Sequence, residues 1–453
     1  MTTQHVTVSK ETNGAVIATA LLAFCGILSE TAMNVTFSHL TEVFHLSLGS
    51  LQWITTAYLL AVAITMTTSA ALKQNMKERT IFTLAFAFFV AGSIVAILTN
   101  QFWLMIVGRL MQGVGTGMAM PLMFNIIAER VPLERIGFYM GIGGLIIGLA
   151  PAFGPTYGGL MIANFPWQWI FIAVIPIAVL AYVIGFLFLE NSRAEKQKRP
   201  FNFLSFIMLV FALSALLLAT SSLEAGQMNW LYVVIFAVAL AIFIILALKD
   251  ANPFLDIRLL GNPLVLFGLL PFAIFQFVNL SVNFVIPNFL TMGLSVSSSM
   301  AGFSLLPGTL LGSVTVPFLG KLYDEKGPRL SLYAGNVIFF LSMVVMSLLT
   351  KSLVLWSIIV IYIVFTMGRN MAFNNTMAAV QSQLPREKSA DITAIFQMIQ
   401  QFAGAFGTAI SAVLVESGGD VMTGSQHVFF LMTVLVVLNF IFYKLMFKQF
   451  STK

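Results

Sequence analysis

Long apolar stretches separated by short polar segments run through the whole chain. A bilayer core about 30 Å thick requires about 20 apolar residues for each helix that spans it. By this criterion fourteen segments qualify, and several are long enough to be tilted. The predicted spans are residues 14–37, 50–72, 80–98, 102–128, 136–162, 168–189, 201–222, 230–248, 264–287, 300–320, 330–350, 353–381, 391–415 and 426–446.

The lysines and arginines support this number of spans, because cytoplasmic loops of membrane proteins carry an excess of both residues. If the N-terminus is cytoplasmic, alternate threading puts every basic residue inside except Lys351, Arg109 and Arg369. Lys351 falls in an outer loop, and the two arginines fall within spans. A missed helix would invert the pattern from that point onward, so we expect both termini to be cytoplasmic.

Composition agrees with a chain whose main solvent is lipid. The chain is 59% hydrophobic and only 9% charged, whereas a soluble domain is about 25% charged. The net charge of +6 comes from loops between spans, so it does not indicate a nucleic-acid partner. The single cysteine, Cys25, excludes an internal disulfide. We therefore expect an all-α, multi-pass protein of the cell membrane, and no metal or organic cofactor is implied.

No motif indicates an enzyme. A phosphate-binding loop needs two glycines and a hydroxyl around its lysine, and the nearest fragment, Gly320-Lys321, lacks the first glycine and the hydroxyl. His39, His45 and His427 fall in predicted outer loops, where they have no arranged nucleophile. The chain is therefore predicted to be neither a hydrolase nor an ATP-driven pump.

Two short sequence similarities between the halves of the chain indicate an internal repeat. Residues 107–111 (Val-Gly-Arg-Leu-Met) recur as 367–371 (Met-Gly-Arg-Asn-Met), and residues 131–135 are echoed by 384–388. Each pair has the same place relative to its helix, which predicts two parallel six-helix bundles with a substrate site between them. The predicted units are an N-terminal bundle, 1–189, an inserted helix pair with its linkers, 190–260, and a C-terminal bundle, 261–453.

The inserted helix pair falls outside the repeat. Residues 231–248 contain no Asn, Gln or ionisable residue, so this helix has nothing polar to shield from lipid. We expect both inserted helices to lie at the periphery, outside the transport path.

Glu30 is the one carboxylate well inside a predicted span. It follows Gly14 by sixteen residues, which puts it about 24 Å from the inner face at about 1.5 Å per residue. Arg109 follows Phe102 by seven residues, or about 10 Å from the outer face. In a core of about 30 Å these depths nearly match. The two charges either form a structural ion pair or line a water-filled cavity.

Other polar residues recur on single helix faces in five spans, at spacings of three and four residues. Such stripes either hold helices together or line a common cavity, and five stripes from both halves favour the cavity. Forty-three phenylalanines and 24 methionines would give it deformable apolar walls. The predicted substrate-binding residues are Asn34, Gln112, Gln276, Asn279, Asn283, Asn370, Asn374, Gln397 and Gln401.

Several motifs, taken in order, resemble the major facilitator superfamily and specifically its fourteen-helix drug:proton antiporter family 2. Residues 52–60 (Gln-Trp-Ile-Thr-Thr-Ala-Tyr-Leu-Leu) are similar to that family's second-helix signature. Residues 108–117 resemble motif B, 154–159 resemble motif C and 320–329 resemble the second copy of motif A. Residues 29–35 resemble the first helix of lincomycin-type exporters.

The resemblance implies roles for particular residues. It implies that Arg109, in motif B, takes part in proton coupling, and that motif C, with Gly154, Pro155, Gly158 and Gly159, marks an exporter. It also implies a gating loop at Asp324, Gly327 and Arg329. The first copy of motif A, at residues 71–79, lacks its aspartate, which puts in doubt the usual charge lock in the first half.

These observations together predict a proton-coupled multidrug efflux antiporter that works by alternating access. Glu30 and Arg109 would couple transport to protons, and the substrates would be amphipathic, often cationic drugs or dyes. The expected partners are protons, small molecules and the lipid bilayer, and the chain is expected to be a monomer. Two alternatives remain: a transporter of one endogenous metabolite on the same fold, and a non-transporting membrane sensor, which would need neither charge nor a polar cavity.

Overall fold

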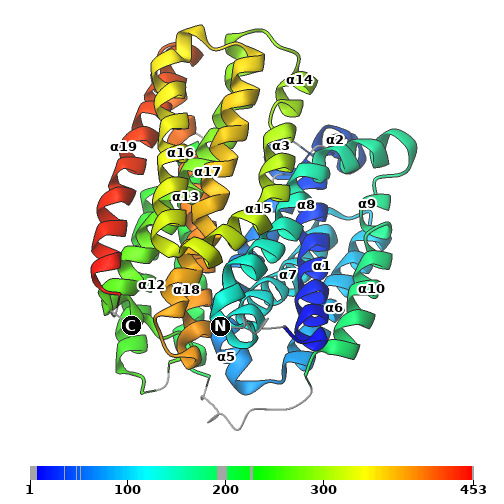
Figure 1. Ribbon diagram of the computed structural model, residues 1–453. Helices are drawn as coiled ribbons and strands as arrows, with labels where there is room; N and C mark the ends of the chain where they lie inside the picture. Colours follow the sequence, from blue (N-terminus) through cyan, green and yellow to red (C-terminus); the bar gives the residue numbers. More distant parts are fainter. Residues whose placement is uncertain are drawn as a thin grey trace.

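The computed structural model describes residues 8–34, 36–46, 48–51, 53–190, 201–224, 228–251 and 253–450. All regular secondary structure in these ranges is helical. The long helices run roughly side by side, and both ends of the chain lie at the same end of the bundle (Figure 1). We call this the terminal end.

Thirteen described helices are long and apolar enough to cross a membrane, and the number rises to fourteen if the bent pair α4 and α5 forms one span. The predicted all-α, multi-pass fold is therefore confirmed. The spanning helices are α1 (Lys10–Asn34), α4 (Trp53–Thr67) with α5 (Ser69–Asn75), α6 (Glu78–Leu98), α7 (Phe102–Arg130), α8 (Ile136–Asn164), α9 (Trp169–Ile172) with α10 (Ile175–Phe188), α11 (Phe203–Glu224), α12 (Trp230–Lys249), α13 (Pro263–Asn288), α15 (Leu306–Lys326), α16 (Pro328–Leu349), α17 (Leu355–Ser382), α18 (Ser389–Ser417) and α19 (Val421–Lys448).

The bend of 50° between α4 and α5 has a local cause. The hydroxyl of Thr67 donates to the carbonyl of Ile64 at 2.6 Å, and that of Thr68 donates to Thr65 at 2.7 Å. Hydroxyls that bond back onto the preceding turn compete with the helical ladder and bend it. The shorter elements are α2 (Phe37–Phe44), α3 (Leu48–Leu51), α14 (Ser298–Phe303), η1 (Leu133–Arg135), η2 (Ile257–Gly261), η3 (Phe289–Gly293), η4 (Thr350–Ser352) and η5 (Arg386–Lys388).

The predicted internal repeat is a repeat of helix packing. In the first half, a Cβ atom added to Gly108 of α7 would lie 2.8 Å from the carbonyl oxygen of Gly92 in α6. In the second half, a Cβ atom added to Gly368 of α17 would lie 2.9 Å from the carbonyl oxygen of Gly335 in α16. Both close approaches place backbone against backbone. In each half an arginine follows the glycine of the second helix, Arg109 after Gly108 and Arg369 after Gly368.

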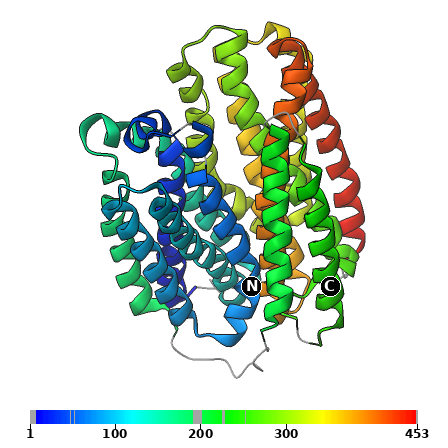
Figure 2. The same ribbon diagram turned by 180° about the vertical axis from the view of Figure 1, so that it is seen from behind.

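The halves meet along two seams. On one side α8 packs directly on α15, and on the other α4 and α5 contact α18. The inserted helix α11 contacts both α4 and α18, whereas α12 packs mainly on α11. Figure 2 shows the green pair α11 and α12 in front of the second seam.

Candidate functional site

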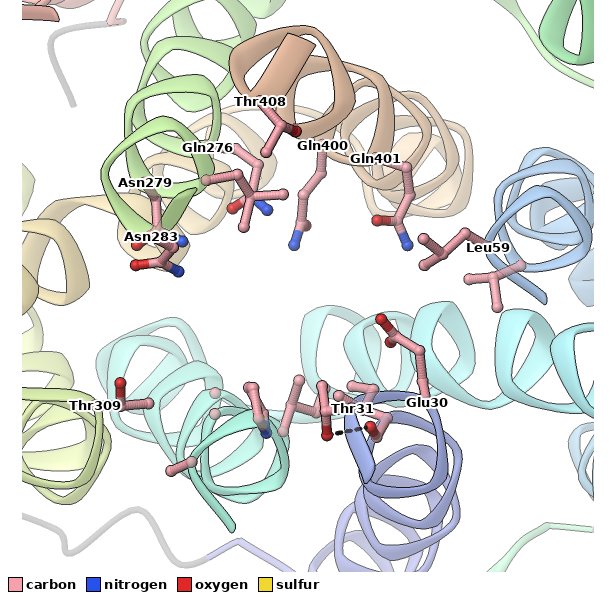
Figure 3. Close-up of a pocket in the computed structure, with 18 of the residues that line it drawn as sticks. Glu30, Thr31, Leu59, Gln276, Asn279, Asn283, Thr309, Gln400, Gln401 and Thr408 are labelled. Carbon is pink, nitrogen blue, oxygen red and sulfur yellow. Dashed lines mark hydrogen bonds between the residues drawn. The ribbon is translucent and has the colours of Figure 1, made fainter. Parts of the chain in front are cut away.

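A cavity of about 1020 Å³ lies between the two halves. Its walls come from α1, α4, α7, α8, α11, α13, α14, α15, α17 and α18, and most of its lining is apolar. Figure 3 shows Glu30 and Thr31 of α1 on one side, and amide side chains of α13 and α18 on the other. The polar residues that line it include Glu30, Thr31, Thr116, Gln276, Asn279, Asn283, Thr309, Arg369, Asn370, Asn374, Gln397, Gln400, Gln401 and Thr408.

Glu30 is the one carboxylate among the described residues that line this cavity. It points into the open space, and Gln400 and Gln401 lie across from it (Figure 3). Its position there follows from the sequence, because a charge deep in a span is tolerated where it meets water or a partner. Glu30 can therefore bind a proton or a cation from the cavity.

Arg109 lies behind the cavity wall instead of in it. Its side chain is fully buried, and its Nε donates to the main-chain carbonyl of Ile54 at 3.2 Å. The guanidinium carbon lies 4.2 Å from the centre of the Tyr58 ring, and Tyr58 itself lines the cavity. Arg109 forms no ion pair with Glu30 in the described chain, so the two charges interact only at longer range.

Gln112 was predicted to line the cavity, but the structure places it elsewhere. It is fully buried and does not line the cavity within the described part of the chain. Its Oε1 accepts from Arg109 Nη1 at 2.7 Å, and its Nε2 donates to the hydroxyl of Ser93 in α6 at 2.8 Å. Gln112 therefore orients Arg109 by hydrogen bonding. The side chain of Asn34 lies outside the described residues.

The polar stripes of the second half face the cavity. All seven predicted residues from α13, α17 and α18 line it. Amide side chains both donate and accept hydrogen bonds, so this wall can meet varied polar groups. These residues are Gln276, Asn279, Asn283, Asn370, Asn374, Gln397 and Gln401.

The motif with Gly154, Pro155, Gly158 and Gly159 packs α8 beside Glu30. Pro155 lines the cavity, and a Cβ atom on Gly154 would collide with the side chain of Thr31 in α1. Gly158 is buried, whereas Gly159 has open space where a Cβ would stand.

The predicted gating loop joins the two halves at the terminal end. Asp324 of α15 accepts hydrogen bonds from the backbone N–H groups of Gly137 at 2.8 Å and Phe138 at 2.9 Å, in the first turn of α8. A carboxylate at a helix N-terminus also interacts favourably with the helix dipole. Gly327 ends α15 with a φ of 83°, where glycine has no steric cost. Arg329 lies over the ring of Phe447 at 5.6 Å.

The first half keeps a charge network at this end despite its altered motif. Glu78 pairs with both Lys73 and Arg130. Lys73 also lies 3.0 Å from Glu129, and Arg130 lies 3.2 Å from Glu190. The missing aspartate put the usual charge lock in doubt, and in the structure Glu78 supplies a carboxylate for ion pairs nearby.

The model of the Major Facilitator Superfamily matches residues 19–408. The chain belongs to this superfamily. Lincomycin resistance protein LmrB of Listeria monocytogenes is 33% identical over 89% of the chain and 86% of its own length. Riboflavin transporter RibZ of Clostridioides difficile is 27% identical over 85% of the chain and 84% of its own length. The human organic anion transporter MFSD10 superposes with a TM-score of 0.70 at 15% identity, covering 96% of this chain and 99% of that one.

The fold and family are those of multi-pass membrane transporters. One feature of this superfamily chain departs from our prediction. Leu217 and Thr220 of α11 line the cavity, so the prediction that both inserted helices lie only at the periphery is wrong for α11. The polar-poor α12 has no residue in the lining within the described chain.

Arg369 is a further cavity residue that the sequence argument did not select. It follows Gly368 just as Arg109 follows Gly108, and it was visible as a charge within a span. Only the repeat and that charge pointed to it. Gln400 and Thr309 also line the cavity and were also missed. Gln400 lies beside the predicted stripe of α18, and Thr309 lies in α15, for which no stripe was predicted.

Proposed function

We propose that this transporter exports amphipathic, often cationic compounds in exchange for protons. The observation that carries the proposal is Glu30, the one carboxylate in the lining of the described cavity, on a helix that packs against α7, α8 and α10. If one carboxylate binds either a proton or a cationic substrate, the binding of one excludes the binding of the other. Lincomycin resistance proteins of matching length support a drug-like substrate.

The lining suits substrates of varied shape. Apolar side chains provide most of the contact area, and the amides of α13, α17 and α18 provide hydrogen bonds that can be donated or accepted. Glu30 would select for positively charged substrates. The buried charge of Arg109 would adjust the affinity of Glu30 for protons and cations through its electric field. Gln112 would act by fixing the orientation of Arg109.

Alternating access would require the halves to part at the terminal end. The contacts that would break include the Asp324 hydrogen bonds and the bond of 2.5 Å from Arg386 Nη1 to the main-chain oxygen of Glu129. We take residues 1–189 and 261–453 as the moving units, joined by 190–260, in a monomer. The terminal end would be cytoplasmic in the cell membrane.

Orientation can be tested by labelling cysteines in a Cys25→Ala background. Phe165 is 46% exposed beside one end of α8, and Leu133 is 44% exposed beside the other. A membrane-impermeant maleimide applied to intact cells should label Phe165→Cys and not Leu133→Cys. The reverse labelling would contradict cytoplasmic termini.

Proton coupling can be tested by substrate-induced proton release from purified protein. Glu30→Gln keeps size and hydrogen bonding but cannot titrate, so it should release no protons when a cationic dye binds. Glu416→Gln removes an exposed carboxylate outside the cavity lining and serves as the control. If Glu30→Gln releases protons as the parent does, Glu30 is not the group that carries the proton.

A second candidate is the exporter of one endogenous metabolite on the same fold. The observation that favours it is the similarity to a riboflavin transporter over most of both chains. Competition separates the two: a drug exporter should be inhibited by chemically unrelated amphiphiles, whereas a metabolite exporter should be inhibited only by close analogues.

A further inference from the structure

Arg369 brings a positive charge to the cavity wall formed by the second half. It lines the cavity, and its Nη2 donates to Gln276 Oε1 at 2.8 Å. Its Nη1 donates to Asn370 Oδ1 at 3.1 Å, and its guanidinium carbon lies 4.3 Å from the centre of the Phe373 ring. These three contacts fix the plane of the guanidinium group.

The surrounding amides are turned so that they present donors. A guanidinium group can only donate, so the oxygens of Gln276 and Asn370 face Arg369 and their NH₂ groups are left for other acceptors. Tyr362 donates its hydroxyl to Asn283 Oδ1 at 2.7 Å, which likewise leaves the NH₂ group of Asn283 as a donor. The wall near Arg369 is therefore positive and rich in N–H donors.

This wall has no anion of its own. Arg369 forms no ion pair within the described chain, and its Nε is buried without a hydrogen-bond partner there. The one carboxylate in the described lining, Glu30, projects from α1 on the other side of the cavity (Figure 3). Two of the five N–H donors bond to the amides of Gln276 and Asn370, and the planar fork of a guanidinium group matches a carboxylate in geometry as well as in charge.

The equivalent arginine of the first half shows that such a residue need not face the cavity. Arg109 is fully buried and donates to a main-chain carbonyl and to Gln112. Arg369 has no main-chain carbonyl among its hydrogen-bond acceptors in the described chain, and it reaches the lining instead. A purely structural role would not require that exposure.

We propose that the cavity binds zwitterionic amphiphiles, with the carboxylate at Arg369 and the amine or other cationic group at Glu30. The proposal rests on the proposed function and narrows its substrate class. A molecule with both charges would contact the two halves at once, through one charged residue from each. Compounds that carry only the cationic group would use Glu30 and would place no carboxylate at Arg369.

A matched pair of dyes tests this inference. Rhodamine 110 carries a free carboxylate on a cationic ring system, and rhodamine 123 is its methyl ester. The two uptake rates are measured in proteoliposomes with an imposed proton gradient, against protein-free liposomes, and their ratio is compared between variants. Arg369→Gln should lower the ratio of acid to ester at least tenfold, and Arg369→Lys, which keeps the charge but not the fork, should lower it less. Lys351→Gln removes an exposed positive charge outside the described cavity lining and should leave the ratio as in the parent.

A ratio within twofold of the parent value in Arg369→Gln would overturn the inference. Should that variant fail to fold, dye binding to the purified parent decides: the acid should bind at least tenfold more tightly than the ester, and equal affinities would overturn the inference. A parent that transports rhodamine 123 and excludes rhodamine 110 also overturns it and leaves the proposed function standing. A parent that transports neither dye contradicts the proposed function and this inference together.

Discussion

Gly137 of α8 and Gly320 of α15 lie with their backbones in direct contact at the terminal end of the bundle. A Cβ atom added to Gly137 would lie 2.5 Å from the carbonyl oxygen of Gly320, and one added to Gly320 would collide with the carbonyl of Gly137. Because the obstructing atoms are backbone atoms, no rotamer change can relieve the clash. The two halves can close at this end only while both positions lack a side chain.

Gly320→Ala should therefore hold the halves apart at the terminal end. We expect the rate of dye export from energised cells to fall at least tenfold, with protein levels similar to the parent. Gly261→Ala is the control, because a Cβ there meets nothing within 4 Å. Normal export by Gly320→Ala would show that this contact is not needed for the transport cycle.

Asp324→Asn should weaken the same closure by a different route. The variant loses the charge that lies at the start of α8, an interaction worth about 1 kcal/mol and up to about 2 kcal/mol when partly buried. The closed state should lose population about five- to thirtyfold. Reagent access from the terminal side to a cysteine at Val316, which lines the cavity and is buried in this structure, measures this. Glu325→Gln, which removes an exposed pair with Lys321, should change access little, since such pairs contribute about 0.3–0.5 kcal/mol.

Arg109 and Gln112 should behave as one stabilising unit. Arg109→Met leaves Gln112 Oε1 and the carbonyl of Ile54 without their donor, and each unsatisfied buried group costs about 1–3 kcal/mol. Gln112→Leu leaves Arg109 and Ser93 short of a partner in the same way. The Tm of purified protein should fall in both single variants, and the double variant should lose less than the sum of the two losses. Strictly additive losses would contradict a shared role.

The inserted helices should differ in their sensitivity to added bulk. Leu217→Phe extends into the cavity from α11, so it should change the relative rates at which dyes of different size are exported. Val234→Phe in α12 is the matched control, because Val234 is 57% exposed and is not part of the described cavity lining. Equal behaviour of the two variants would contradict a place for α11 in the transport path.

The spans were predictable because lipid demands about 20 apolar residues for each crossing and leaves charges to the loops. The cavity-facing amides of the second half were predictable for a similar reason, since spacings of three and four residues place side chains on one face. Gln276, Asn279 and Asn283 follow that spacing, and all three line the cavity.

Periodicity identifies a shared helix face but not the neighbour that covers it. Arg109, Gln112 and Thr116 form one stripe, yet of these only Thr116 is part of the described lining. The ring of Tyr58, from another helix, stands over Arg109. The position of α11 was equally hidden, because an apolar sequence suits contact with lipid and contact with α4 or α18 alike.

The position of α11 also bears on the surrounding bilayer. One seam between the halves is closed by direct contact of α8 with α15, whereas α11 flanks the other and presents Leu217 and Thr220 to the cavity. Without α11 that flank would face acyl chains, which compete for the same apolar surface as an amphipathic substrate. Because α11 contacts both α4 and α18, the insertion would screen the cavity from membrane lipid on that flank.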